Sequence, residues 1–250
     1  MGLSTVQDEQ TVKGTFQKIW SEADLESMVR LSPMDEEIAH VVLRNLPAKA
    51  DCRILEAGSG SGKVSVQIAQ AGHVLTLLDI CQEALEISKQ VFRLKQCGFR
   101  AICASMFSMP VHDRSFDVVW NAGVIEHFYY AEQVKALSEM ARVLKPGGMI
   151  ITLNPSHRGW LYRWGKYRME KSGIWPYGQE FPVTSLGRHC RDLGLRLVAE
   201  REVLPEFQYL FHGERGARLF RACQKFPLLK RLTGGIFGGY LKLSLIQNVA

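Results

Sequence analysis

Short apolar runs alternate with amphipathic segments of helical length between residues 53 and 153, and this alternation restricts the fold more than any other feature. The predicted strands are Arg53–Ala57, Val74–Asp79, Phe99–Cys103, Phe116–Asn121 and Met149–Leu153. The predicted helices between them are Lys63–Ala71, Gln82–Gln96 and Ala131–Leu144. Near-continuous apolar strands that alternate with helices are typical of a parallel sheet buried on both faces. The chain is therefore predicted to be an α/β protein with a doubly wound sheet that binds ligands at the carboxyl ends of its strands.

The flanking regions are less regular. Residues 1–31 are predicted to form an arm or one or two short helices, and Ser32 is a strong N-cap for the helix that follows. Beyond the fifth strand, further elements are predicted at Thr184–Leu193 (helix), Leu195–Val203 (strand) and Tyr240–Val249 (strand). We interpret residues 1–250 as one domain, with a ligand-binding core at 32–154 and a substrate-side part at 155–250 that contains the insertions.

Composition excludes some classes of protein. At 46% hydrophobic and 22% charged residues, the chain has an ordinary globular balance rather than that of a disordered protein. Its most apolar stretches have strand length, so no membrane span is expected, and no secretory signal is visible at the start. The six cysteines are scattered without metal-ligand spacing, which predicts a reducing, cytoplasmic environment and no metal site.

Charge is divided unevenly along the chain. The net charge is +6, but residues 1–150 carry 15 Lys and Arg against 18 Asp and Glu, whereas residues 151–250 carry 16 against 7. The two parts therefore have net charges of −3 and +9. This asymmetry favours either an anionic partner for the C-terminal part or simple compensation of the acidic part.

The most informative motif is the glycine-rich turn Ile54-Leu-Glu-Ala-Gly-Ser-Gly-Ser-Gly62 between a strand and a helix. Its glycines permit a tight turn and a close approach of the backbone to a ligand. A dinucleotide fingerprint needs a further glycine where Lys63 stands, which argues against a nicotinamide cofactor. Asp79 ends the next strand, 21 residues beyond Gly58, where it can accept hydrogen bonds from ribose hydroxyls. Together the turn and Asp79 predict an adenosine-bearing ligand.

At this point the chain resembles the class I S-adenosylmethionine-dependent methyltransferases, and more closely the small-molecule branch that includes quinone-biosynthesis enzymes. The similar stretch covers about Arg53–Leu153 and includes the glycine turn, Gly-Val-Ile-Glu-His127 and Leu-Lys-Pro-Gly-Gly148. The resemblance implies a Rossmann-like methyltransferase fold, with seven strands of which the last is antiparallel, and S-adenosylmethionine as cofactor.

The resemblance also implies roles for individual residues. Glu56 and the glycines would line the methionine moiety, Asp79 would hold the ribose, and Ser105 and Met106 would flank the adenine. Asn121 and the turn after it would border the sulfonium. Ser105 departs from the aspartate that is frequent at its position. The cofactor-binding residues expected on this basis are Glu56, Gly58, Ser59, Gly60, Gly62, Asp79, Ile80, Ser105, Met106 and Asn121.

A base is useful if the methyl acceptor must lose a proton. His127, after the fourth predicted strand, is the first candidate, although it can equally have a structural role at a helix start. His157, just past the fifth strand, is the second candidate. Glu126, beside His127, can be an orienting group or a charge at the start of a helix.

The acceptor side must come from the irregular segments. No Asn/Asp-Pro-Pro-Tyr/Phe motif follows the fourth strand, where Asn121-Ala-Gly-Val124 stands instead, and this disfavours nucleic-acid amine methylation. The aromatic segment Pro155–Tyr177 can form a lid or pack on the sheet, and the basic–apolar helix predicted within Arg215–Lys230 can contact an anionic membrane or, less favoured, RNA. We predict methyl transfer to a small aromatic or lipophilic acceptor; the alternative is a catalytically silent S-adenosylmethionine-binding protein that recruits a partner or an anionic membrane.

Overall fold

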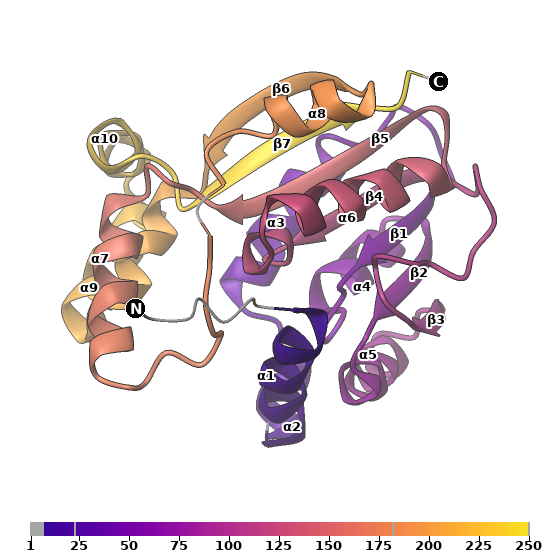
Figure 1. Ribbon diagram of the computed structural model, residues 1–250. Helices are drawn as coiled ribbons and strands as arrows, with labels where there is room; N and C mark the ends of the chain where they lie inside the picture. Colours follow the sequence, from indigo (N-terminus) through magenta and orange to yellow (C-terminus); the bar gives the residue numbers. More distant parts are fainter. Residues whose placement is uncertain (1–7, 23, 182, 250) are drawn as a thin grey trace, which may run out of the picture.

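All the strands of the structure belong to one sheet. The structure is a computed structural model that describes residues 8–22, 24–181 and 183–249. Its seven strands lie in the order β3-β2-β1-β4-β5-β7-β6 (Figure 1). The strands are β1 (Arg53–Ala57), β2 (Val74–Asp79), β3 (Arg100–Cys103), β4 (Phe116–Ala122), β5 (Leu144–Pro155), β6 (Arg196–Val203) and β7 (Leu241–Gln247). The first five are mutually parallel, and β7 runs antiparallel to both β5 and β6. The predicted doubly wound, mostly parallel sheet is confirmed.

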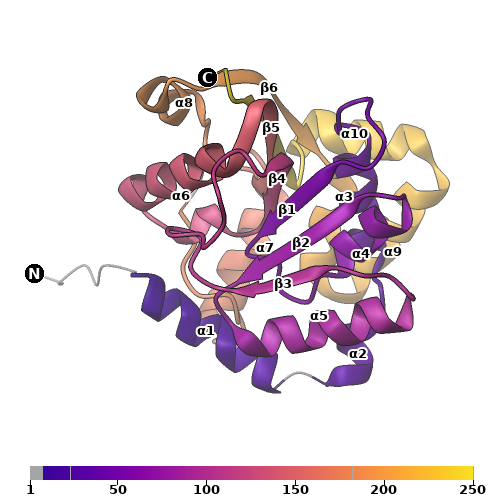
Figure 2. The ribbon, with the colours of Figure 1, turned by 90° about the vertical axis from the view of Figure 1, so that its right-hand side faces the viewer.

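Helices cover both faces of this sheet. They are α1 (Glu9–Glu22), α2 (Leu25–Val29), α3 (Pro33–Leu43), α4 (Lys63–Gln70), α5 (Gln82–Leu94), α6 (Tyr130–Val143), α7 (Trp160–Lys171), α8 (Gly187–Leu193), α9 (Gly213–Lys225) and α10 (Pro227–Phe237), with 3-10 turns η1 (Ile125–His127) and η2 (Pro205–His212). Figure 2 shows α6 and α8 on one side of the sheet and α3, α4 and α5 on the other. Ser32 caps α3 through a reciprocal capping box with Asp35, as its sequence predicts.

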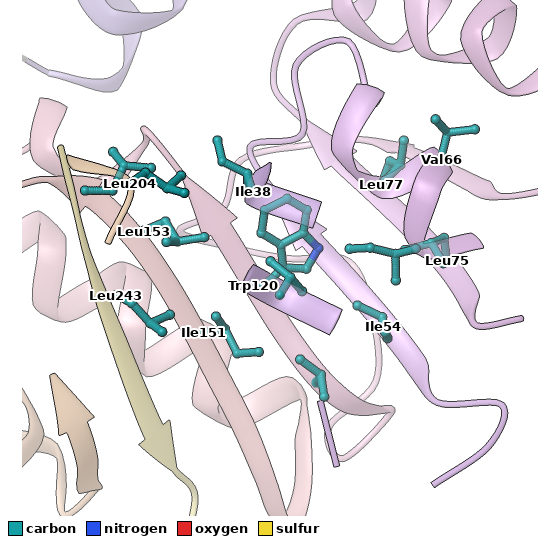
Figure 3. Close-up of a cluster of buried hydrophobic side chains, with 14 of the residues drawn as sticks. Ile38, Ile54, Val66, Leu75, Leu77, Trp120, Ile151, Leu153, Leu204 and Leu243 are labelled. Carbon is teal, nitrogen blue, oxygen red and sulfur yellow. The ribbon is translucent and has the colours of Figure 1, made fainter. Parts of the chain in front are cut away.

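Two buried clusters explain why the strands are apolar on both faces. The larger cluster lies between the sheet and α3, α4, α5 and η2, and Figure 3 shows Trp120 at its centre between Ile54 and Ile151. The second cluster lies under α6 and α8, with Leu55 and Val119 pointing away from the first. Successive strand residues therefore enter different cores, which is the physical basis of the continuous apolar runs.

Two irregular segments contain more helix than the sequence predicts. Residues 155–177 include α7, and the basic segment forms two helices rather than one. The break falls at Phe226, which has an extended backbone (φ −123°, ψ 95°) directly before Pro227. Proline disfavours helical geometry in the preceding residue, so the chain turns there and α10 leaves at a new angle.

No helix within the described residues combines the length and the apolar character needed to cross a bilayer.

Candidate functional site

The turn between β1 and α4 is built from glycines in the left-handed region. Gly58 and Gly60 have φ angles of +80° and +51°. A Cβ atom on Gly58 would lie 2.8 Å from Val124 Cγ2, and one on Gly60 would lie 2.9 Å from Trp20 Cζ2. Any larger residue would therefore strain the turn and displace its neighbours, which explains why the sequence has glycine at both positions.

A cavity of about 270 Å³ opens beside this turn, at the carboxyl ends of β1, β2 and β4. We call it the glycine-turn cavity. It lies where the alternation of strands and helices predicts a ligand site. The residues singled out from the sequence that line it are Glu56, Gly58, Ser59, Gly60, Asp79, Ile80, Met106 and His127.

Asp79 connects the end of β2 to the glycine turn. One carboxylate oxygen accepts a hydrogen bond from the Gly60 amide at 2.8 Å, and the other accepts one from the Cys81 amide at 2.8 Å. Burial raises the pKa of Asp79, and the backbone hydrogen bonds oppose that shift. Asp79 therefore holds the turn in place as well as presenting its carboxylate to the cavity, a second role that its spacing in the sequence does not reveal.

Glu56 provides a second acid, at the end of β1. Its side chain is buried, lines the cavity, and has one oxygen, Oε2, without a hydrogen-bond partner among the described residues. Burial raises the pKa of Glu56 well above its ordinary value. A buried, unsatisfied carboxyl group at the wall of a cavity is complementary to a cation such as an ammonium group. The carboxyl groups of Glu56 and Asp79 thus fit a ligand with an ammonium group at one end and a ribose at the other.

This arrangement predicts a pH-dependent affinity. The pKa of Glu56 is raised in the free protein, and pairing with the ammonium group of S-adenosylhomocysteine would lower it, so binding should release a proton. Affinity should therefore weaken as the pH falls through the raised pKa, by up to about tenfold per pH unit. Calorimetry in two buffers of different ionisation enthalpy measures the released proton. Glu56→Gln should bind more weakly and lose this pH dependence; a flat profile in the unmodified protein would contradict the assignment.

Helix α1 closes one side of the cavity, a role that the sequence does not predict. Val12, Phe16 and Trp20 lie four residues apart, which places them on one helical face, and all three line the cavity. Gln17 anchors the helix by donating to a Glu83 carboxylate oxygen at 2.7 Å. The four-residue spacing of these apolar residues was the available signal, but it does not specify which surface the helix covers.

His127 lies at the end of η1 and also lines the cavity. It is buried, and its Nδ1 is 2.9 Å from the Gln179 carbonyl oxygen. Because a carbonyl can only accept, Nδ1 carries the proton and donates, which leaves the Nε2 lone pair free in the neutral ring. Burial lowers the pKa of His127 and so favours that neutral form. Phe16 packs edge-on against the imidazole, with ring centroids 5.2 Å apart.

Two carboxyl groups lie near this histidine: Glu126, which is buried, and Glu180, which is half-buried. Burial is the main cause that raises the pKa of both Glu126 and Glu180, and Glu180 contributes further to the shift of Glu126. The Tyr162 hydroxyl donates to Glu180 at 2.7 Å, whereas Oε2 of Glu126 has no partner among the described residues. The Glu126 carbonyl accepts from the Phe181 amide, which joins this pair to the segment before α8. Glu126 is thus a buried acid beside the cavity rather than a solvated charge at a helix start.

Two other expected cofactor residues lie outside the cavity lining. Asn121 points to the α6 side of the sheet, where its amide is 3.6 Å from Met140 Sδ, because side chains alternate along β4 and its neighbours Trp120 and Ala122 face the cavity. The expectation that Asn121 borders the sulfonium is therefore not met in this structure. Gly62 is the N-cap of α4, and a Cβ there would lie 2.8 Å from Leu77 Cδ1. Its role is packing.

Ser105 and His157 also lie outside the lining. Ser105 hydrogen-bonds with the Glu9 carboxylate of α1 and accepts from the Phe107 amide at 3.0 Å, so it ties α1 to the loop that carries Met106. His157 follows β5 near Lys242 and has a pKa lowered mainly by burial. Of the two candidate bases, only His127 is at the cavity.

Known proteins resemble this chain in both sequence and structure. A family model described as a methyltransferase domain matches residues 55–152. The biotin biosynthesis bifunctional protein BioHC of Cellvibrio japonicus is 30% identical across 61% of this chain, and the ubiquinone biosynthesis O-methyltransferase of Azoarcus sp. is 28% identical across 59% of it. This chain spans 29% of the first relative and 65% of the second.

The crystal structure of the cyclase SpnF superposes with a TM-score of 0.66 at 17% identity, covering 98% of each chain. That likeness shows the fold. The sheet order, the glycine turn and the match of residues 55–152 to a methyltransferase domain agree with one another, and together they support a class I S-adenosylmethionine-dependent methyltransferase.

Proposed function

We propose that the protein binds S-adenosylmethionine in the glycine-turn cavity and transfers its methyl group to a small aromatic or lipophilic acceptor. The observation that carries the proposal is a cavity whose lining includes the glycine turn, Asp79, the unsatisfied carboxyl group of Glu56 and His127. In this proposal Glu56 pairs with the ammonium group, Asp79 accepts from the ribose hydroxyls, and Met106 packs near the adenine. When bound, the sulfonium supplies an activated methyl group, so the protein mainly has to align the acceptor with it.

An aromatic cluster supports the proposed class of acceptor. It consists of Tyr162, Trp175, Phe211 and Tyr240, and the Tyr162 ring lies 4.8 Å from that of Phe211 and 5.0 Å from that of Tyr240. Tyr162 also hydrogen-bonds with Glu180, so the apolar surroundings include fixed polar groups. These rings do not line the glycine-turn cavity itself, but Tyr177 lies between Trp175 (ring centroids 5.2 Å apart) and Phe16 of the cavity lining (6.4 Å apart). A flat acceptor that carries a hydroxyl group is proposed to lie where the cavity meets this cluster.

His127 is the proposed base. Its protonated Nδ1 is held by the Gln179 carbonyl, so Nε2 can accept a proton from an acceptor as the new bond to the methyl group forms. Its lowered pKa keeps it in the form that can do so at neutral pH. The six cysteines are all free thiols, which supports a reducing, cytoplasmic location as part of the same proposal.

Calorimetric titration followed by a transfer assay tests the function. S-adenosylmethionine and S-adenosylhomocysteine should bind and NADH should not. His127→Gln should retain affinity for both adenosyl ligands but transfer the methyl group about a hundredfold more slowly. His40→Gln, on the exposed side of α3, is the matched control and should behave like the unmodified protein. Failure to bind either adenosyl ligand would reject the function, and unchanged transfer by His127→Gln would reject only the base.

A further inference from the structure

Helix α10 presents an apolar stripe to solvent. Leu228, Leu232 and Ile236 follow one another at four-residue intervals, and each is between 52% and 68% exposed. The opposite side of the helix is anchored, because the Thr233 hydroxyl lies 3.1 Å from Tyr209 Oη and Lys230 pairs with the buried Glu206 at 2.6 Å. The orientation of the helix is thus set by its inner contacts, and its outer face is left apolar.

Helix α7 presents an aromatic stripe of the same kind. Trp160, Trp164 and Tyr167 occupy one side of the helix and are 56–73% exposed. The Arg168 guanidinium lies 5.4 Å from the Trp164 ring, and the Lys171 ammonium lies 5.6 Å from the Tyr167 ring. Exposed aromatic rings accompanied by long cationic side chains are the composition that lies at the boundary between lipid headgroups and acyl chains.

Cations predominate on these helices, although α7 contains Glu170 and α9 has Glu214 in its first turn. No Asp or Glu occurs from Arg215 to the C-terminus. Five cations on α9 and α10 have no ion-pair partner within residues 8–22, 24–181 and 183–249: Arg215, Arg218, Arg221, Lys225 and Arg231. Figure 1 shows α7, α9 and α10 together at one end of the molecule. Uncompensated cations beside exposed apolar stripes are complementary to an anionic lipid surface.

We infer that α7, α9 and α10 form a membrane-docking face that lies in the plane of an anionic bilayer surface, with Leu228, Leu232, Ile236 and the α7 aromatic residues entering the headgroup region. A nucleic acid would engage the cations and stack on the rings, but it would leave the Leu and Ile stripe of α10 in water. An anionic lipid surface can pair with the cations and also bury the Leu and Ile stripe of α10.

Docking in this way also brings the acceptor side to the membrane. The outer face of α7 carries Trp160 and Trp164, while its inner face carries Tyr162 of the aromatic cluster. One helix therefore separates the bilayer from the region where the acceptor is proposed to bind. This part of the inference rests on the proposed function, because it assumes that the acceptor is lipophilic. The docking face itself does not depend on the proposed function.

Flotation with phosphatidylcholine vesicles, with and without phosphatidylglycerol, tests the face in the full-length protein. At low salt the protein should float with the anionic vesicles and much less with neutral ones. Leu232→Gln combined with Ile236→Gln should reduce the bound fraction at least about tenfold. Leu94→Gln, on α5 and 64% exposed, is the matched apolar control.

The cations are tested separately. Arg218→Gln combined with Arg221→Gln should weaken vesicle binding and reduce its salt dependence, whereas Arg93→Gln on α5 should change neither.

The outcomes separate the two proposals. Titration with S-adenosylhomocysteine monitors every variant, and unchanged affinity shows that the cavity is intact. Absence of flotation at low salt, or flotation that Leu232→Gln with Ile236→Gln leaves unchanged, overturns the docking face even if the cofactor binds. Binding of transfer RNA that those two changes leave unaffected, without flotation, would instead assign the cations to a nucleic acid.

Discussion

Asp79→Ala should bind S-adenosylhomocysteine about a hundredfold more weakly than the unmodified protein. The carboxylate accepts hydrogen bonds from the Gly60 and Cys81 amides and is the proposed acceptor for the ribose hydroxyls. Loss of hydrogen bonds to a charged group costs about 1.5–3 kcal/mol each, and every 1.4 kcal/mol is about a factor of ten in affinity. Removal of Asp79 also frees the Gly60 amide, so the turn loses a contact that fixes its shape. Calorimetric titration measures the change.

A second substitution separates these two contributions. Asp79→Asn retains one acceptor oxygen and the side-chain volume but sets an amide donor against a backbone donor, so its affinity should be intermediate. Asp113→Ala removes an exposed carboxylate that pairs with Arg142 in the last turn of α6, outside the cavity lining, and should leave affinity unchanged. A folded Asp79→Ala protein with unaltered affinity would show that Asp79 does not contact the ligand.

Gly216→Ala should lower the free energy of unfolding by about 3 kcal/mol, the upper part of the usual range for overpacking. Gly216 lies in α9 where this helix meets η2, and a Cβ atom there would overlap the Tyr209 carbonyl oxygen and lie 2.9 Å from His212 Cβ. A backbone carbonyl cannot rotate away as a side chain can, so α9 must shift from η2. Urea denaturation measures the loss.

Gly235→Ala is the matched control for that experiment. Gly235 lies in α10, and a Cβ there would meet no atom within 4 Å. Alanine has the higher helix propensity, so this substitution should stabilise the protein by about 0.5–1 kcal/mol. Equal effects of the two substitutions would show that the close approach of α9 and η2 does not limit stability.

Local sequence predicts the sheet well because both faces of the parallel strands are buried. Arg53–Ala57 and Val74–Asp79 have the predicted bounds, since a run of apolar residues that ends in a glycine turn or an acid leaves little freedom in where the strand stops. The glycine turn is equally local. Its shape requires positive φ angles that only glycine adopts at low cost, so the motif predicts both the geometry and the position of the cavity.

Tertiary packing decides the features that depend on which surfaces meet. Asn121 and Trp120 are adjacent in β4, yet only Trp120 faces the cavity, because the direction of each side chain follows from the strand's place between β1 and β5. The apolar spacing of Val12, Phe16 and Trp20 predicts a helix but not the cavity that it closes.

The sequence by itself thus determined the succession of strands and helices in the core motif, the glycine turn and the acids Glu56 and Asp79, since all of these depend on local periodicity and backbone geometry. Only the tertiary structure decided that α1 forms a wall of the cavity, that His127 rather than His157 reaches it, and that the basic segment divides into α9 and α10. These outcomes depend on long-range contacts between segments that are far apart in the chain, and no local pattern encodes them.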